Sequence, residues 1–417
     1  MSKLISNNFK KILIGLAILA IFINPIAGAN NNWTMFQENV EHTGFIDEAG
    51  DFVSNLWMHG MNNPILSSPA IQDKIIYVIS QNGLLEAVNM ENGNKNWEYQ
   101  LNGTVTASPV VKGDNLFVGT IVNNNKGYMY NYNVENERLS WKFETSKPIE
   151  STATVTNDTL YFGADNGKVY ALDAKDGSKL WEKEIGGKVK SSPTYVNGTL
   201  YIGSTNGVIF ALNGNDGTQI WNYTTGDQVV ASPSYGDNKV YIGSLDGTFY
   251  SLNGNDGTLV WKYDLGNKVN SSASLDLRNN NLYVGSDSGN LTCLDTRDGT
   301  FKWAYKTGGD VRSTPAIYDD KVVFGSNDGT QYILNKYTGN PKLAYNPGTY
   351  LFNSPITSSS VVYGETIFFA GNDGYLYSLD GDKLNTPISV FIYYTIIVLI
   401  AILAVIIALV VFIRRRE

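Results

Sequence analysis

The sequence contains very little cysteine and histidine. Its 417 residues include one cysteine, Cys293, and two histidines, His42 and His59. A single cysteine excludes an intramolecular disulfide, and so few Cys and His residues exclude a Cys/His zinc cluster. No separate Ser-His-Asp motif of the kind used by nucleophilic hydrolases is present either. We therefore expect no metal ligand, no catalytic residue and no bound cofactor, and for His42 only a local contact.

Positive charge is also scarce. The chain has 31 Lys and Arg residues against 39 Asp and Glu residues, which gives a net charge of −8. When the three lysines of the N-terminal segment and the net +2 of the last four residues are set aside, the central part carries −13. An acidic domain repels phosphate backbones, so we do not expect nucleic acid as a partner.

Apolar runs mark both ends of the chain. Lys10 and Lys11 precede an apolar run over residues 12–26, and Ala27-Gly28-Ala29 follow as a cleavage site, which predicts a signal peptide over residues 1–29. An uncleaved anchor is the alternative, although this run is shorter than the ~20 residues that a span needs. Residues 385–413 carry no charge and three arginines follow, which predicts a transmembrane helix and a cytoplasmic tail over residues 414–417. We expect a single-pass plasma-membrane protein whose main part is extracytoplasmic.

Between these ends, tryptophan recurs at a nearly constant spacing. The series is Trp57, Trp97, Trp141, Trp181, Trp221, Trp261 and Trp303, with Leu343 at the next position. Within one repeat, such as residues 181–221, four β-rich runs alternate with turns such as Asn-Gly and Asp-Gly. A period near forty built from four strands is typical of a propeller blade. We predict an all-β fold, an eight-bladed β-propeller of four-stranded antiparallel blades over residues 30–384.

Each repeat also contains an element that resembles Ser-Ser-Pro. The eight copies are Ser67-Ser68-Pro69, Ala107-Ser108-Pro109, Ser151-Thr152-Ala153, Ser191-Ser192-Pro193, Ala231-Ser232-Pro233, Ser271-Ser272-Ala273, Ser313-Thr314-Pro315 and Asn353-Ser354-Pro355. We assign this element to the innermost strand, because strands that converge on the axis need small side chains. Proline fits there because an edge strand tolerates the loss of a backbone donor.

The residue before each of these elements varies in size and charge, whereas its neighbours are aliphatic or small. We name these eight residues the rim column: Leu66, Thr106, Glu150, Lys190, Val230, Asn270, Arg312 and Phe352. Packing that repeats in every blade should select similar residues, so this variation favours a partner-binding funnel at one mouth of the channel. The alternative is solvated variation around a water-filled pore.

The two ends of the propeller are expected to meet in one blade. The last repeat ends after its third strand, near Leu379, whereas residues 51–57 resemble the outer strand that precedes each tryptophan. We predict that Phe52–Trp57 complete the blade that contains Ser354, because ring closure removes free sheet edges. We expect the tryptophans of all blades to pack between neighbouring blades, and not to form a stacking surface for a ligand.

Two other features have a plain structural interpretation. The loops Asn213–Gly217 and Asn253–Gly257 faintly resemble calcium loops but lack the carboxylate density and terminal Glu of that motif, so we interpret them as tight turns. Cys293 aligns with alanine or serine in other blades, and we expect a small buried residue there.

Seven Asn-x-Ser/Thr sequences are possible glycan acceptors in an extracytoplasmic chain. Their asparagines are Asn32, Asn102, Asn157, Asn197, Asn222, Asn270 and Asn290. The alternative is the general richness of this sequence in turn residues.

The repeat region, from Trp57 to about Leu384, resembles the PQQ-like (pyrroloquinoline-quinone enzyme) propeller repeat. Asp-Gly-x-x-x-Trp over residues 216–221 and 256–261 is similar to the tryptophan-docking motif of that family, and residues 33–36 with 42–44 resemble the lead-in of BamB-like propellers. The resemblance implies either a quinoprotein dehydrogenase, with calcium ligands, a catalytic Asp and often adjacent cysteines, or a non-catalytic scaffold. No cofactor residue maps onto this sequence, and the lipid-modified cysteine of BamB is absent.

From these observations we expect a non-catalytic binding or scaffold module, a monomer, for surface proteins or envelope components. The alternatives are a PQQ-dependent oxidoreductase and a carbohydrate- or cell-wall-binding module.

Overall fold

Strand-forming residues alternate with tight turns along the repeats, and the backbone follows this pattern. The run Thr199–Gly203, rich in β-branched and aromatic residues, forms a strand, a turn closes at Gly207, and Val208–Asn213 form the next strand. The computed structural model describes residues 39, 42, 45–46, 57–156, 158–348 and 353–381. The predicted signal peptide (1–29), transmembrane helix (385–413) and tail (414–417) lie outside the described residues. Within the described part, no helix is long and apolar enough to cross a membrane.

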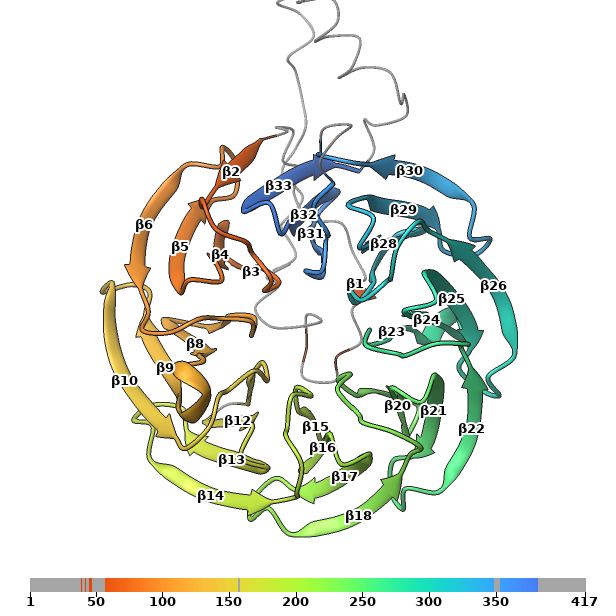
Figure 1. Cartoon of the computed structure of the whole chain (residues 1–417), viewed down its shortest axis with the longest axis horizontal. Helices are drawn as coiled ribbons and strands as arrows, with labels where there is room; N and C mark the ends of the chain where they lie inside the picture. The colour runs from red at the N-terminus through yellow and green to blue at the C-terminus, as the bar shows by residue number, and fades with distance from the viewer. Residues whose placement is uncertain are drawn as a thin grey trace, which may run out of the picture. The chain divides into compact units, whose positions relative to one another are not determined.

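The strands form eight sheets arranged as a ring, which confirms the predicted eight-bladed propeller (Figure 1). In each blade the first strand lies nearest the centre and the last lies outermost. Blade 1 contains β3 (Ala70–Gln72), β4 (Ile75–Ile79), β5 (Leu84–Asn89) and β6 (Lys95–Gln100). Blade 2 contains β7 (Val110–Lys112), β8 (Asn115–Gly119), the 3-10 turn η1 (Asn123–Asn125), β9 (Gly127–Asn133) and β10 (Arg138–Thr145). Blade 3 contains β11 (Thr154–Val155), β12 (Thr159–Gly163), β13 (Lys168–Asp173) and β14 (Lys179–Glu184).

The remaining blades repeat this order around the ring. Blade 4 contains β15 (Thr194–Val196), β16 (Thr199–Gly203), β17 (Val208–Asn213) and β18 (Gln219–Thr224). Blade 5 contains β19 (Ser234–Gly236), β20 (Lys239–Gly243), β21 (Thr248–Asn253) and β22 (Leu259–Asp264). Blade 6 contains β23 (Ser274–Asp276), η2 (Leu277–Asn279), β24 (Asn281–Gly285), β25 (Asn290–Asp295) and β26 (Phe301–Lys306). Blade 7 contains β27 (Ala316–Tyr318), β28 (Lys321–Gly325), β29 (Gln331–Asn335) and β30 (Pro341–Tyr345), and blade 8 contains β31 (Val361–Tyr363), β32 (Thr366–Ala370) and β33 (Tyr375–Asp380).

An N-terminal strand completes blade 8, as predicted from the sequence. This strand is β2 (Met58–Gly60), which pairs antiparallel with β33 directly after Trp57. The predicted strand, Phe52–Trp57, ended one residue before β2 begins, and its residues 52–56 lie outside the described residues. His59 on β2 also reaches the buried Glu86 on β5 of blade 1, with Nε2 and Oε2 separated by 2.5 Å. The ring is therefore closed by sheet pairing and by a polar contact to the following blade.

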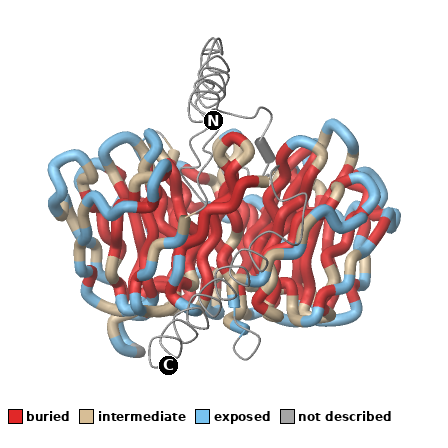
Figure 2. The backbone as a smooth tube through the Cα atoms, turned by 90° about the horizontal axis from the view of Figure 1, so that it is seen from above, coloured by how far each residue is buried: buried red, intermediate tan, exposed pale blue. Residues whose placement is uncertain are grey.

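The tryptophans pack between neighbouring blades, which confirms their predicted structural role. The indole of Trp221 in blade 4 donates to the carbonyl oxygen of Gly254 in blade 5 at 2.8 Å, and its ring covers Gly257. Such a donor bond to the next blade recurs at Trp57, Trp141, Trp181, Trp261 and Trp303. The buried residues accordingly run through the middle of the ring, whereas the loops on both faces are exposed (Figure 2).

The Ser-Ser-Pro-like elements form a hydrogen-bonded ring around the channel. In seven of the eight elements the backbone N–H of the second residue donates to the hydroxyl of the second residue in the next blade; for Ser192 and Ser232 the distance is 2.9 Å. Seven such bonds connect Ser68, Ser108, Thr152, Ser192, Ser232, Ser272, Thr314 and Ser359. We call this set the serine ring. Seven of its eight members accept a backbone amide through their hydroxyl, which explains why these residues are small and also hydroxylated.

The serine ring corrects one assignment made from the sequence. In blade 8 the ring passes through Ser359, and Ser358 bonds Ala370 twelve residues ahead, as Ser313 bonds Gly325. Ser358-Ser359-Ser360 therefore takes the place that was predicted for Asn353-Ser354-Pro355. The cause is a longer connection: the buried Ile356 follows its counterpart Val311 by 45 residues, whereas a spacing of 40 residues is usual in this chain.

Candidate functional site: the rim of the channel and its occupant

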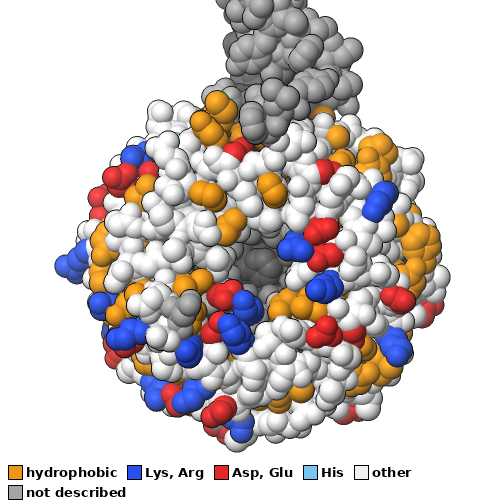
Figure 3. Space-filling view, in the orientation of Figure 1, with side chains coloured by type: hydrophobic (Ala, Val, Ile, Leu, Met, Phe, Trp, Pro, Cys, Tyr) orange, Lys and Arg blue, Asp and Glu red, His pale blue; other side chains and the backbone are white. Residues whose placement is uncertain are grey.

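Antiparallel blades give the ring two unlike faces. The rim column lies on the face formed by the loop that enters each blade and by the turn between its second and third strands. Charged side chains of both signs gather at two places beside the central opening in the face that Figure 3 shows, and the rim between them carries little charge. Residues of the rim column belong to two such charged groups, one between blades 3 and 4 and the other between blades 6 and 7.

The first group joins blades 3 and 4. Lys190 Nζ lies 2.9 Å from Glu150 Oε2, so the acidic point and one of the cations that we predicted in the funnel form an ion pair. Beside them Lys188 Nζ lies 2.7 Å from Oδ2 of Asp165, whose side chain is 4% exposed. This hydrogen bond raises the pKa of Lys188. Both lysines of this group are thus neutralised by the neighbouring blade.

The second group joins blades 6 and 7. The guanidinium of Arg312 forms two hydrogen bonds of 2.9 Å with the carboxylate of Asp287, and it lies 3.0 Å from Asp310. Asn270 donates to the same Asp287 carboxylate at 3.0 Å. The hydrogen bond to Asp287 is the main cause that raises the pKa of Arg312. The structure therefore brings Asn270 and Arg312 together through a carboxylate that the sequence analysis had not singled out.

The rest of the rim column is uncharged. Leu66, Thr106 and Val230 are half-buried and lie one per blade around the opening. Phe352 lies outside the described residues, and the corrected register gives its place to Thr357, whose hydroxyl donates to Asn372 Oδ1 at 3.1 Å. The eighth position of the column is therefore polar and not aromatic.

Three carboxylates of the rim, those of Asp165, Asp287 and Asp310, were missed by the sequence analysis. Asp165 and Asp287 occupy the same place in their blades, directly after the second strand and its following residue. An alignment of the repeats at that position would have shown acidic residues in blades 3 and 6 only. Their partners follow 23 to 25 residues later, in the loop that enters the next blade.

An open pocket of about 780 Å³ lies next to the first charged group. It is lined by Ser146, Lys147, Asp165, Asn166, Gly187, Lys188, Thr205 and Gln228. Most of these polar groups already bond one another; Asn166 Nδ2, for example, donates to Ser146 Oγ and to Tyr170 Oη. The pocket is open and lined by residues of polar types, which suits contact with a partner surface better than capture of a small molecule.

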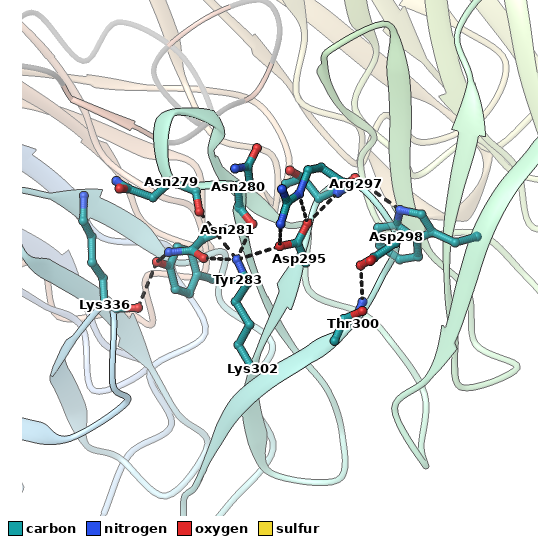
Figure 4. A network of polar contacts seen from close by, with 12 residues as sticks. Asn279, Asn280, Asn281, Tyr283, Asp295, Arg297, Asp298, Thr300, Lys302 and Lys336 are labelled. Atoms are coloured by element: carbon teal, nitrogen blue, oxygen red, sulfur yellow. Dashed lines mark hydrogen bonds and ion pairs between the residues drawn. The ribbon is translucent and has the colours of Figure 1, made fainter.

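A further polar network lies on the opposite face, at turns of blade 6 (Figure 4). The ammonium of Lys302 lies 2.6 Å from both the carbonyl oxygen of Asn280 and the side-chain oxygen of Asn281, and 3.1 Å from Asp295 Oδ2. Arg297 donates two hydrogen bonds to Asp295, and these lower the pKa of that carboxyl. The charges of Lys302, Arg297 and Asp295 are paired with one another, so their role is to hold the turns together.

The loops that faintly resemble calcium loops are tight turns. Asp216 Oδ1 accepts hydrogen bonds from the backbone N–H of Thr218 at 2.9 Å and from its hydroxyl at 2.7 Å, and Asp256 does the same for Thr258. Among the described residues no group of three or more His, Cys, Asp or Glu side chains is placed to hold a metal ion. Cys293 is buried as predicted, and burial raises the pKa of its thiol to about 12. A single cysteine also excludes the adjacent cysteines that many quinoprotein dehydrogenases carry.

The asparagines of the predicted glycan sequons differ in accessibility. Asn102, Asn197 and Asn222 are exposed. Asn270 and Asn290 are half-buried, and their side-chain amides donate to Asp287 and Ser288. Asn32 and Asn157 lie outside the described residues.

The prediction of a local contact for His42 holds only for its backbone, whose N–H donates to the carbonyl oxygen of Asn39 at 3.1 Å, whereas its side chain makes distant contacts. Its Nδ1 lies 2.9 Å from Thr194 Oγ1 and 3.2 Å from the carbonyl oxygen of Pro233, 152 and 191 residues away in the inner strands of blades 4 and 5. His42 is 1% exposed, and burial lowers the pKa of its imidazole to about 4. Three residues later β1 (Phe45–Ile46) pairs in parallel with β27, the innermost strand of blade 7, which makes that sheet five-stranded. Parts of the N-terminal lead-in therefore lie inside the ring.

These contacts define an eight-bladed propeller whose blades are joined by docked tryptophans and by a hydroxyl ring. A family model described as "Outer membrane protein assembly factor BamB" matches residues 54–193, 165–278 and 258–385. The chain therefore belongs to this family of PQQ-like propellers. A search of curated proteins found no match.

Solved structures of two functional kinds share the fold. BamB from Moraxella catarrhalis is 16% identical with a TM-score of 0.66, over 78% of this chain and 99% of that chain. A europium-containing methanol dehydrogenase is 13% identical with a TM-score of 0.69, over 82% and 90%. The quinohemoprotein alcohol dehydrogenase from Comamonas testosteroni is 14% identical with a TM-score of 0.68, over 88% and 83%. At such low identity these similarities concern the fold alone.

Proposed function

We propose that this protein is a non-catalytic binding or scaffold module for surface proteins or envelope components. In this proposal the C-terminal segment anchors it in the plasma membrane, with the propeller on the extracytoplasmic side. The observation that carries the proposal is a contrast between frame and rim. The frame, meaning the docked tryptophans, the Asp-Gly turns and the serine ring, is nearly the same in every blade. The rim differs from blade to blade, as a surface selected by a partner would.

The charged groups of the rim support this proposal in a specific way. Arg312 is fixed by two carboxylates while its side chain stays 45% exposed. An oriented and partly exposed arginine is a common anchor in protein interfaces. The same pairing argues against a simple electrostatic site, because the lysines and arginine of the rim already have carboxylate partners.

Capture experiments with matched arginine variants test the proposal. The full chain, tagged after Glu417, is expressed in its native host, cross-linked on intact cells and purified with its partners. Arg312→Ala should weaken capture by roughly 1–4 kcal/mol. Arg297→Ala is the control, since Arg297 also pairs with an aspartate but lies at a turn of the opposite face. If both variants capture the same partners as the wild type, the partner does not use this rim.

Two further assays separate the alternatives. Protease added to intact cells should remove the propeller and spare the tag; a protected propeller would reverse the proposed topology. The purified full chain with added quinone and calcium should not reduce an electron-accepting dye, and quinone-dependent reduction would favour the oxidoreductase. Capture of envelope polysaccharide in place of protein would favour the carbohydrate-binding module.

A further inference from the structure

The N-terminal lead-in makes two separate contacts with the wall of the channel. One is the imidazole of His42, held at Thr194 and Pro233, and the other is the backbone of β1, held along β27. β1 also lies next to β23, the innermost strand of blade 6. The two contacts are only three residues apart in the sequence. A single short segment thus touches the inner strands of four neighbouring blades.

The histidine contact is built into a repeating feature of the wall. In blades 3 to 6, a hydroxyl on the inner strand donates to the backbone carbonyl at the proline position of the next blade. Thr194 donates to Pro233 in this way at 2.5 Å, and both groups are buried. The carbonyl oxygen of Pro233 also lies in hydrogen-bond distance of His42. The imidazole of His42 therefore joins a series of hydroxyl–carbonyl hydrogen bonds that connect neighbouring blades.

The strand contact uses the free inner edge of blade 7. An innermost strand presents backbone groups that its own blade does not pair, and such an edge accepts an added strand. Phe45 and Ile46 lie opposite Ile317 and Tyr318 in this ladder. With only two residue pairs, the ladder is short enough to be exchanged.

We propose that this part of the channel wall is a peptide-binding site, which the lead-in of the same chain fills in cis as a plug. The ligand that fits is an extended peptide with a neutral imidazole followed, three residues later, by an apolar strand. The rim column would then remain available to other partners. This proposal is independent of the proposed function, because capture at Arg312 and occupancy of the channel are measured separately.

Addition of the lead-in in trans tests the site. The probe is a fluorescein-labelled synthetic peptide of residues 38–48, titrated into the full chain and into a variant that lacks these residues. Circular dichroism of the variant establishes that it is folded. The deletion variant should bind the peptide saturably, whereas the wild type should bind it at least about ten-fold more weakly, because its site is filled. The same peptide with His42→Ala is the matched control and should also bind about ten-fold more weakly.

Three outcomes would overturn the proposal. The peptide could bind the wild type and the deletion variant equally, the two peptides could bind equally, or neither could bind a folded deletion variant. If the deletion variant does not fold, histidine modification of the intact chain decides. With only two histidines, diethyl pyrocarbonate labelling followed by mass spectrometry reports each one separately. His42 should be protected in the wild type and become reactive in Phe45→Pro, while His59 keeps its rate. A His42 that reacts as fast in the wild type as in the free peptide would show that the plug is absent.

Discussion

Substituting Gly257 by alanine should break the docking of one tryptophan and leave the rest of the frame intact. Gly257 has a φ of +73°, and an added Cβ would lie 2.6 Å from Cε3 of Trp221. Two costs therefore add. A non-glycine residue in the left-handed region costs roughly 1–2 kcal/mol, and an overpacked contact costs about 1–3 kcal/mol more.

Gly266 separates these two costs. Its φ is +78°, almost the same as that of Gly257, but an added Cβ would meet nothing within 4 Å. Gly266→Ala therefore reports the backbone cost alone. We expect Gly257→Ala to lower the free energy of unfolding by about 1–3 kcal/mol more than Gly266→Ala. Guanidinium unfolding of the full chain, followed by far-UV circular dichroism, measures both values, provided that the m-value does not change.

A double-mutant cycle with Trp221→Ala attributes the difference to the indole ring. Once the ring is removed, the additional cost of Gly257→Ala should disappear, which gives a coupling energy of roughly 1–3 kcal/mol. Equal destabilisation by Gly257→Ala and Gly266→Ala would refute the docking argument. So would a cycle in which the two substitutions simply add.

Three other outcomes are expected. Ser232→Ala should destabilise the chain by about 1–3 kcal/mol, since it leaves the buried amide of Ser192 without its acceptor. Ser232→Thr keeps the hydroxyl and should be tolerated. Equal unfolding midpoints for the two variants would contradict the serine ring. Cys293 should resist maleimide at pH 8 in the native chain, because burial raises its thiol pKa to about 12. Labelling as fast as in the denatured chain, measured by mass spectrometry, would contradict this. Burial lowers the pKa of His42 from 6.5 to about 4, so the docked lead-in favours the neutral imidazole. Its docking should be most stable above pH 6.5 and weaken by up to roughly 3 kcal/mol as the pH falls to about 4, seen as faster hydrogen exchange at Phe45 and Ile46; the same profile in His42→Asn would contradict this.

The repeating parts of the fold could be predicted because every blade needs similar residues at the same positions. The spacing of tryptophans such as Trp221 and Trp261 indicated the number of blades, and the docking geometry explains why a glycine of the next blade, Gly257 or Gly299, lies against each ring. The register of blade 8 could not be predicted in the same way. Asn353-Ser354-Pro355 contains the expected proline, while the true element, Ser358-Ser359-Ser360, is identified only by its hydrogen bonds.

Features that occur once were the least accessible from sequence. His42 bonds residues 152 and 191 positions away, and no repeated pattern marks such a contact. The partners of Arg312 lie on different elements, one after β24 and one before β27, and only the ring brings them together. Packing that repeats in every blade can be predicted from a single sequence. A pair of contacting residues that occurs only once can be identified only in the folded structure.

The pairing of β33 has a mechanical consequence. β33 is the last described strand of the chain, and it lies between β32 and β2 and not at a sheet edge. A force that acts along β33 would load its hydrogen bonds to β32 and to β2 together, in shear. Strands that are sheared resist force better than strands that are peeled from an edge one bond at a time. Because β2 comes from the other end of the repeat region, tension at the C-terminal end is shared with the first blade through His59 and Glu86. This closure would therefore distribute a load that is applied at either end of the repeat region.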